Sequence, residues 1–260
     1  MYVIFNTLIS PDGTGGFALF SPWHAAWVCV GAAVCAALCG VYRRKDGRAR
    51  RSLRLCVSGG ALAMELLRAA VLIAAGEYTL GRLPLHLCAM SVYFMVYHAL
   101  SGNGIMGQFL YALSMPGAAS ALLFPDWGNC PPLSFLSVSG FGVHILLVGY
   151  PLMLTAGGDI RPDIRKARYA LCVLAAIAVP VYVFNILAGT NFMFLRAPAP
   201  NSPMAWFAFL GEPWYLAGLA PVLALVWAVL FWPFRADNSG AKLLVGADNQ
   251  HTRDSKREDI

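Results

Sequence analysis

The sequence predicts an all-α protein: a polytopic membrane bundle of seven transmembrane helices, with its N-terminus outside the cell and its C-terminus in the cytoplasm. Only 12% of the 260 residues are charged, whereas an ordinary soluble domain carries about 25%. The mean hydropathy is +0.62, and the charges gather in a few short stretches between long apolar runs. Too few charges remain to cover a water-facing surface, which is typical of a protein with several membrane spans.

Seven apolar segments are close to the length of a membrane span. They cover residues 22–42, 53–76, 83–100, 104–124, 134–155, 169–188 and 214–232. About 20 residues of helix cross a hydrocarbon core of about 30 Å. The runs are continuous and do not alternate between apolar and polar residues, so they favour helices over the strands of a barrel.

The basic residues predict the orientation of the chain. Of 19 Lys and Arg residues, seven lie in 43–54, four in 161–168 and five in 235–257. With seven spans these stretches fall on one side of the membrane, and the positive-inside rule makes that side the cytoplasm. The net charge of +6 is therefore a signal of topology. It does not indicate nucleic-acid binding, because the basic residues are split among loops.

Three regions follow from this topology. Residues 1–21 form an outer N-terminal segment, residues 22–232 the seven-helix membrane domain, and residues 233–260 a polar cytoplasmic tail that we expect to be disordered. The outer connection 189–213 is apolar and rich in proline, which suits a cap on the outer face. Pro116, Pro151 and Pro180 lie inside predicted spans and are expected to kink them.

Two charged residues lie inside the second span. Glu65 and Arg68 are three positions apart, so they share a helix face and can pair. A charge at the bilayer centre costs about 2.5–3.5 kcal/mol on insertion scales, and ionisable groups there commonly mark functional sites. A structural ion pair that offsets its own insertion cost is an equally good interpretation of these two residues.

Two histidines lie in the third and fifth spans. His86 begins the third span, and helical spacing places Tyr93 and Tyr97 on its face; taken alone, it would be an interfacial histidine. His144 lies about ten residues into the fifth span, near mid-membrane, where both ring nitrogens need partners. We interpret His144 as a site group that faces inward, with a satisfied core histidine as the alternative.

Four further residues near the outer ends of spans are candidates for substrate binding. Asn185 ends the sixth span and Asn191 opens the connection after it; taken singly, both are also common in caps and turns. Trp214 and Tyr215 begin the seventh span, where an aromatic belt is the simpler interpretation.

The predicted topology places most of these candidates at one level, between mid-membrane and the outer surface. They are Glu65, Arg68, His86, His144, Asn185 and Asn191. If their helices face one another, these side chains line a polar pocket in the outer half of the bundle. That pocket explains why an otherwise apolar run carries His86.

Five short motifs occur in order over most of residues 60–220. They are LPLHLC in the third span, LLFPD at the end of the fourth, the histidine inside the fifth, TNFMFLRAP after the sixth and PWYLAG at the start of the seventh. Together they resemble the YwaF family of bacterial integral membrane proteins, which is related to transmembrane protein 164 of animals. The resemblance implies a seven-helix protein of the bacterial cytoplasmic membrane. It also implies a relation to an acyltransferase that moves fatty acyl chains onto lysophospholipids, ether lipids in particular.

The resemblance also implies a set of corresponding site residues. The matching positions are Glu65 with Arg68 after it, His86, His144, Asn191, and Pro213, Trp214 and Tyr215. The animal branch reads Asn-Pro-Cys-His in the third span, and its cysteine is the proposed catalytic residue. Leu85 stands at that position here, so an acyl-cysteine step does not carry over. Cys88 follows His86 by two residues, about 200° around a helix, so it does not simply substitute.

These residues fit two classes of function. In the first, a membrane acyltransferase acts on (lyso)phospholipid: His86 or His144 is the general base, and Arg68 holds a phosphate or an oxyanion. Glu65 then orients Arg68 or a histidine. In the second, the same Glu, Arg and His groups form a relay in a transporter of small solutes or protons.

Other classes are excluded or weakly supported. All four lysines lie in loops or the tail, so a retinal Schiff base, and with it a rhodopsin, is excluded. No dense cluster of His, Asp and Glu predicts a metal site. We expect no cofactor and no nucleic-acid partner; the expected partners are membrane lipids and an acyl donor.

Overall fold

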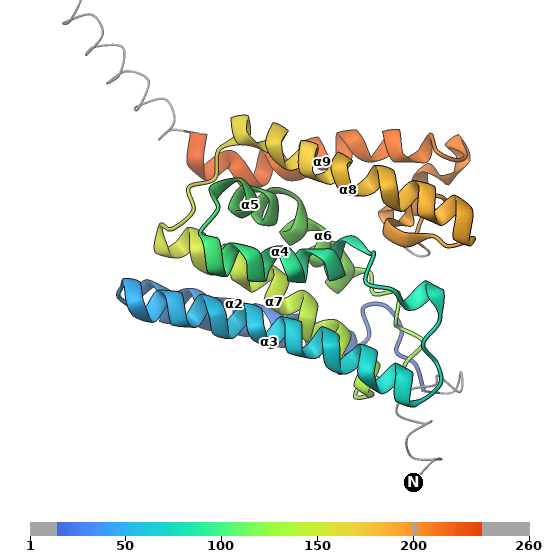
Figure 1. Cartoon of the computed structure of the whole chain (residues 1–260), viewed down its shortest axis with the longest axis horizontal. Helices are drawn as coiled ribbons and strands as arrows, with labels where there is room; N and C mark the ends of the chain where they lie inside the picture. The colour runs from blue at the N-terminus through green and yellow to red at the C-terminus, as the bar shows by residue number, and fades with distance from the viewer. Residues whose placement is uncertain (1–14, 200–201, 236–260) are drawn as a thin grey trace, which may run out of the picture.

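A computed structural model describes residues 15–199 and 202–235 of the chain. In these residues every regular element is helical, and no strand occurs (Figure 1). The helices are α2 (Pro22–Arg43), α3 (Gly47–Ala74), α4 (Leu87–Ser101), α5 (Gly104–Phe109), α6 (Met115–Leu123), α7 (Phe135–Gly157), α8 (Ala167–Ala188) and α9 (Tyr215–Phe231). The short helical segments are η1 (Leu80–Arg82), η2 (Leu110–Ser114), η3 (Ile164–Lys166), η4 (Phe192–Phe194), η5 (Pro203–Leu210) and η6 (Trp232–Phe234).

The helices fall on the seven predicted apolar segments, and α5, η2 and α6 together cover the fourth. Among the described residues, five helical stretches are long and apolar enough to cross a membrane: Pro22–Arg43, Gly47–Ala74, Phe135–Gly157, Ile164–Ala188 and Tyr215–Phe234. Helix α4 is apolar but shorter, with 15 residues. The number of crossings and their direction stay predictions. Residues 1–14 and 236–260, which make up most of the predicted end segments, lie outside the described residues.

The helices form three layers (Figure 1). Helices α2 and α3 form one outer layer, α4 to α7 the middle, and α8 and α9 the opposite layer. The connections after α2, α4 and α7 lie at one end of the bundle, and those after α3, α6 and α8 lie at the other (Figure 1). We call the first the basic end, because the arginine-rich turn 43–50 lies there. We call the second the site end, because it carries His86.

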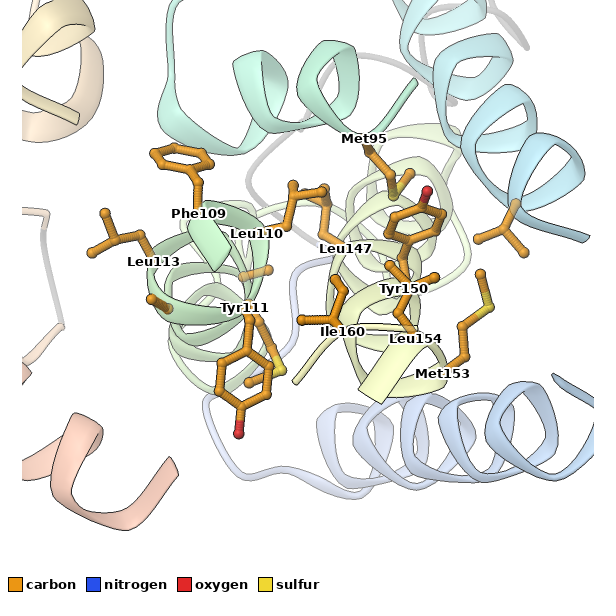
Figure 2. Close-up of a cluster of buried hydrophobic side chains, with 14 of the residues drawn as sticks. Met95, Phe109, Leu110, Tyr111, Leu113, Leu147, Tyr150, Met153, Leu154 and Ile160 are labelled. Carbon is orange, nitrogen blue, oxygen red and sulfur yellow. The ribbon is translucent and has the colours of Figure 1, made fainter. Parts of the chain in front are cut away.

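Helix α7 runs through the centre of the bundle. Within its apolar stretch 61% of the residues are buried, against 11–22% in the other four long stretches. Its side chains Leu147, Tyr150 and Met153 pack with Met95 of α4 and Phe109 of α5 in the main apolar core (Figure 2). The other long helices therefore present wide apolar faces outward, which fits contact with lipid.

Pro116 shapes the fourth segment. Proline has no backbone N–H, so the carbonyl of Ala112, four residues earlier, loses its usual partner within the helix. The chain forms a π turn at η2 directly before the proline. Trp227 of α9 donates its indole N–H to the Ala112 carbonyl at 2.7 Å, and Tyr111 donates its hydroxyl to the Leu230 carbonyl at 2.7 Å. The interruption expected at Pro116 is thus the place where α9 docks.

At the basic end, Asp159 ties three helices together. This residue follows α7, and its carboxylate pairs with Arg50 at 2.9 Å and with Arg54 at 2.5 Å, both on α3. The hydroxyl of Tyr42 on α2 donates to the same carboxylate at 2.5 Å. Hydrogen bonds to a charged acceptor are stronger than neutral ones, so this arrangement fixes how α2, α3 and α7 meet.

Trp227→Phe removes the indole N–H and keeps most of the apolar ring. We expect it to lower the free energy of unfolding by about 1–2 kcal/mol, because the buried Ala112 carbonyl then lacks its donor. Thermal unfolding of the purified protein in detergent micelles measures the loss. Trp232→Phe is the matched control, since Trp232 is exposed. Equal shifts for both variants would show that the bond to Ala112 does not stabilise the bundle.

Candidate functional site

The expected ion pair forms on α3. Arg68 Nη1 lies 3.9 Å from Glu65 Oε2, one helical turn away. The Glu65 side chain is 12% exposed and that of Arg68 is 35% exposed, so the guanidinium is the more accessible partner. A guanidinium has five N–H donors, and a single long contact leaves most of them for a further anion.

His144 lies on α7 against an indole ring. Its Nδ1 is 2.7 Å from the carbonyl oxygen of Gly140, one turn earlier in the same helix. A carbonyl only accepts, so Nδ1 carries the proton of the neutral ring and Nε2 holds the lone pair. The Trp127 ring lies 5.0 Å from the imidazole, centroid to centroid. Within the described part of the chain nothing hydrogen-bonds Nε2, so this nitrogen can accept a proton.

His86 lies before α4 rather than in it. It is the N-cap residue, with an extended backbone (φ −69°, ψ 148°), and the helix begins at Leu87. Helical spacing therefore does not apply to His86, and the expected face shared with Tyr93 and Tyr97 is wrong. Both tyrosines are exposed.

The ring of His86 contacts the loop after α8. The backbone N–H of Met193 donates to His86 Nδ1 at 3.3 Å. Because Nδ1 accepts this bond, the proton of the neutral ring is on Nε2. The rings of Phe192 and Phe194 each lie 5.2 Å from the imidazole. His86 thus presents a donor nitrogen, where His144 presents an acceptor.

The loop 189–197, here called the cap loop, carries these contacts to His86. Met193 and Phe194 have positive φ angles of 57° and 52°. Residues other than glycine seldom adopt this conformation, so the surrounding structure must hold it in place.

Three of the predicted substrate-binding residues support the cap loop. The buried side chain of Asn185 accepts the Phe192 N–H at 2.8 Å and donates to the Phe192 carbonyl at 2.9 Å. Asn191 accepts the N–H of Arg196 at 2.9 Å. The buried Tyr215 donates its hydroxyl to the backbone carbonyl of Phe194 in the loop. These three side chains therefore form hydrogen bonds with the backbone of the cap loop. The fourth residue, Trp214, is exposed at the start of α9.

Electrostatic interactions join side chains from three separate parts of the site end. His86 and His144 interact with each other, and Arg68 interacts with both rings. Asp126, between α6 and α7, interacts with both histidines and with Cys88. Glu65 also interacts with Cys88. These six residues of the site end influence one another electrostatically, and we call them the polar cluster: Glu65, Arg68, His86, Cys88, Asp126 and His144.

Asp126 and Trp127 were not among the site residues predicted from the sequence. The sequence analysis also placed Cys88 on a different helix face from His86. The LLFPD motif and the WG that follows it contain the first two, but no local pattern shows that this connection reaches α4 and α7. The helical angle of about 200° that argues against Cys88 does not apply, because His86 precedes the helix.

The polar cluster can support proton transfer beside an anion. His144 offers an acceptor nitrogen, His86 a donor nitrogen, and Arg68 a cation. Within residues 15–199 and 202–235, no three His, Cys, Asp or Glu side chains are grouped as metal ligands.

A family model described as the TMEM164 family matches residues 19–231, which include the whole polar cluster and the cap loop. No curated protein and no solved structure matches the chain.

Gly140→Ala should move Trp127 away from His144. A β-carbon at Gly140 would lie 3.0–3.3 Å from three atoms of the Trp127 ring, so the indole must shift. We expect the free energy of unfolding to fall by about 1–2 kcal/mol, although alanine favours a helix. The control is Gly59→Ala on α3, where a β-carbon meets nothing within 4 Å and stability should rise slightly. A rise for both variants in thermal unfolding would contradict the packing of Trp127 on α7.

Proposed function

We propose that this protein, which belongs to the TMEM164 family, is a membrane-bound acyltransferase that modifies (lyso)phospholipids at the polar cluster. Its family and its apolar helices make it a multi-pass integral membrane protein. The observation that carries the proposal is the complementary pair of histidines, each of which interacts electrostatically with Arg68. His144 Nε2 can accept a proton and His86 Nε2 can donate a hydrogen bond.

The proposed reaction moves an acyl group from a donor ester to the hydroxyl of a lysolipid. His144 Nε2 takes the hydroxyl proton as the oxygen attacks the acyl carbonyl carbon. The Nε2–H of His86 stabilises the negative charge that develops on the carbonyl oxygen. When the bond to the donor oxygen breaks, His144 returns the proton to that oxygen and is neutral again. This direct transfer needs no cysteine nucleophile, which is consistent with Leu85 at the position of the animal cysteine.

Arg68 binds the phosphate of the lipid in this proposal, and Glu65 orients the guanidinium. The exposed fractions support this division, since the arginine is the more accessible of the two. Asn185, Asn191 and Tyr215 act as positioning residues, because they hold the cap loop against His86. The exposed Trp214 contacts lipid at the start of α9.

We further propose seven crossings, with the basic end in the cytoplasm of a bacterium and the polar cluster in the outer half of its cytoplasmic membrane. The gathering of Arg and Lys at the basic end supports this orientation. Acyl-CoA is cytoplasmic, so an acyl donor at the level of the polar cluster is a phospholipid of the outer leaflet.

Transport of protons or small solutes through the same residues is the alternative function. The observation in its favour is a second set of polar side chains at the basic end: Tyr42, Arg54, His98, Tyr150 and Asp159. A buried tier that is mainly apolar lies between the two sets. Its members Ala61, Val92, Met95 and Leu147 are 0–1% exposed. This tier argues against a continuous polar path and favours the enzyme.

His144→Gln should reduce acyl transfer at least 100-fold, because the general base is lost. The purified protein is supplied with lysophospholipid and a phospholipid donor that carries an isotope-labelled acyl chain, and mass spectrometry follows the labelled product. The variant must keep the thermal midpoint of the parent protein. Full activity in this variant would refute the assignment of His144. A parent protein that leaves lipids unchanged but moves protons or solutes across liposomes would support the alternative.

Cys88→Ala tests whether the transfer is direct. We expect it to retain activity, as should the matched variant Cys172→Ala, which changes an exposed cysteine on α8. A selective loss in Cys88→Ala, together with a labelled acyl group on the Cys88 peptide, would replace the direct step by a covalent one.

Arg68→Gln should raise KM for lysophospholipid about 10-fold with a smaller change in kcat, because it removes a charge-assisted bond to the phosphate. Arg68→Lys should recover part of the loss. A monoacylglycerol, which has no phosphate, should react equally with parent and variant. Equal losses for both acceptors would instead give Arg68 a structural role.

A further inference from the structure

We infer that a groove at the basic end binds an anionic phospholipid at a site separate from the polar cluster. The groove has a volume of about 570 Å³ and lies between the end of α2 and the start of α3. The lining residues used here are Val41, Lys45, Arg48, Ser52, Leu53 and Cys56. The groove and the polar cluster lie at opposite ends of α3, so this inference does not rest on the proposed function.

Two acidic residues, Asp46 and Asp159, lie near the groove. Asp159 is occupied by Arg50 and Arg54. Asp46 lines the groove, but its carboxylate accepts the Ala49 N–H at 2.9 Å as the N-cap of α3. Asp159 is therefore fully used, whereas Asp46 keeps Oδ2 open, so Lys45 and Arg48 (+2) with Asp46 (−1) leave a net charge of +1 on the groove lining.

The cations in the groove have no such partner. Lys45 and Arg48 are exposed and form no ion pair with any described residue. A phosphate complements an arginine and a lysine placed side by side, and each basic residue at a membrane surface attracts anionic lipid. The Ser52 hydroxyl, one turn after Arg48, adds a hydrogen-bond donor on the same face.

The rest of the groove is apolar. Arg48, Ser52 and Cys56 recur every four residues on α3, and Val41 and Leu53 add apolar surface beside them. The nine residues from Arg48 to Cys56, which are eight steps of about 1.5 Å, extend about 12 Å along the helix. The groove therefore fits an amphiphile, with its phosphate at the α2–α3 turn and an acyl chain along α3. A soluble phosphate compound would contact only the charged part of the groove, at Lys45 and Arg48.

Native mass spectrometry of the full-length protein tests the site, with phosphatidylglycerol and phosphatidylcholine of identical acyl chains as probes. The parent protein should bind phosphatidylglycerol at least 10-fold more tightly. Lys45→Gln/Arg48→Gln should weaken that binding at least 10-fold. Arg43→Gln/Arg44→Gln removes the same charge from the same turn outside the groove lining, and should weaken it less than 3-fold. Equal losses, or equal binding of both lipids, would overturn the inference.

Alkylation of Cys56 shows where the lipid binds. Phosphatidylglycerol should slow the reaction of Cys56 at least 5-fold and leave Cys29 unchanged, since both are exposed but Cys29 lies in the first half of α2, away from the groove. Phosphatidylcholine and glycerol 3-phosphate should protect neither cysteine. Protection by glycerol 3-phosphate alone would make the groove a site for a soluble phosphate and refute the lipid. No protection of Cys56 by any probe would place the lipid elsewhere.

Discussion

The glycines of α7 allow its neighbours to reach its backbone, and the rest of the bundle depends on that contact. A β-carbon at Gly142 would collide with the Met64 side chain of α3, and one at Gly149 would lie 2.9 Å from Leu38 of α2. Lipid tails are as apolar as leucine, so membrane helices associate through close van der Waals packing of small residues. His144 lies between these two glycines. The packing therefore fixes the level of its ring relative to α2 and α3.

In the packed bundle, polar side chains of α3, α4 and α7 lie at two levels, here called tiers, one toward the basic end and one toward the site end. On α3, α4 and α7 a polar residue lies toward each end of the bundle, with a mainly apolar stretch between them. The pairs are Arg54 and Glu65, His98 and Cys88, and Tyr150 and His144. Ionisable groups are costly in hydrocarbon unless they have partners, and each tier supplies them across helices. Met95 and Leu147, both labelled in Figure 2, belong to this apolar stretch and to the main core.

Much of the fold could be predicted because hydropathy and helix length are local properties. The apolar segments, the interruption at Pro116 and the Glu65–Arg68 pair follow from residues close in sequence, and the five motifs were enough to indicate the family. The site was less predictable because it joins distant connections. Asp126 and Trp127 reach the site only through the folded α6–α7 connection. Because α4 begins at Leu87 and not at His86, the helical angle between His86 and Cys88 no longer applies.

The roles of the asparagines were also hidden from the sequence. Asn185 and Asn191 are polar residues at a helix end, a position that suits either a ligand or a turn. Only the path of the cap loop shows that their amides are used by its backbone, which holds Met193 over His86. In the sequence, an asparagine that binds a ligand looks the same as an asparagine that holds a loop in place.

The bond from Trp227 to Ala112 has a consequence for how the protein is made. The two residues are 115 positions apart, and the tryptophan is on α9, the last long helix among the described residues. At about 5–20 residues per second, the ribosome needs roughly 6–23 s to reach Trp227 after Ala112. During that interval the Ala112 carbonyl, which has no partner within the helix, must accept a hydrogen bond from water or from the insertion machinery. The Ala112 carbonyl therefore gains its hydrogen-bond donor only after α9 has been synthesised.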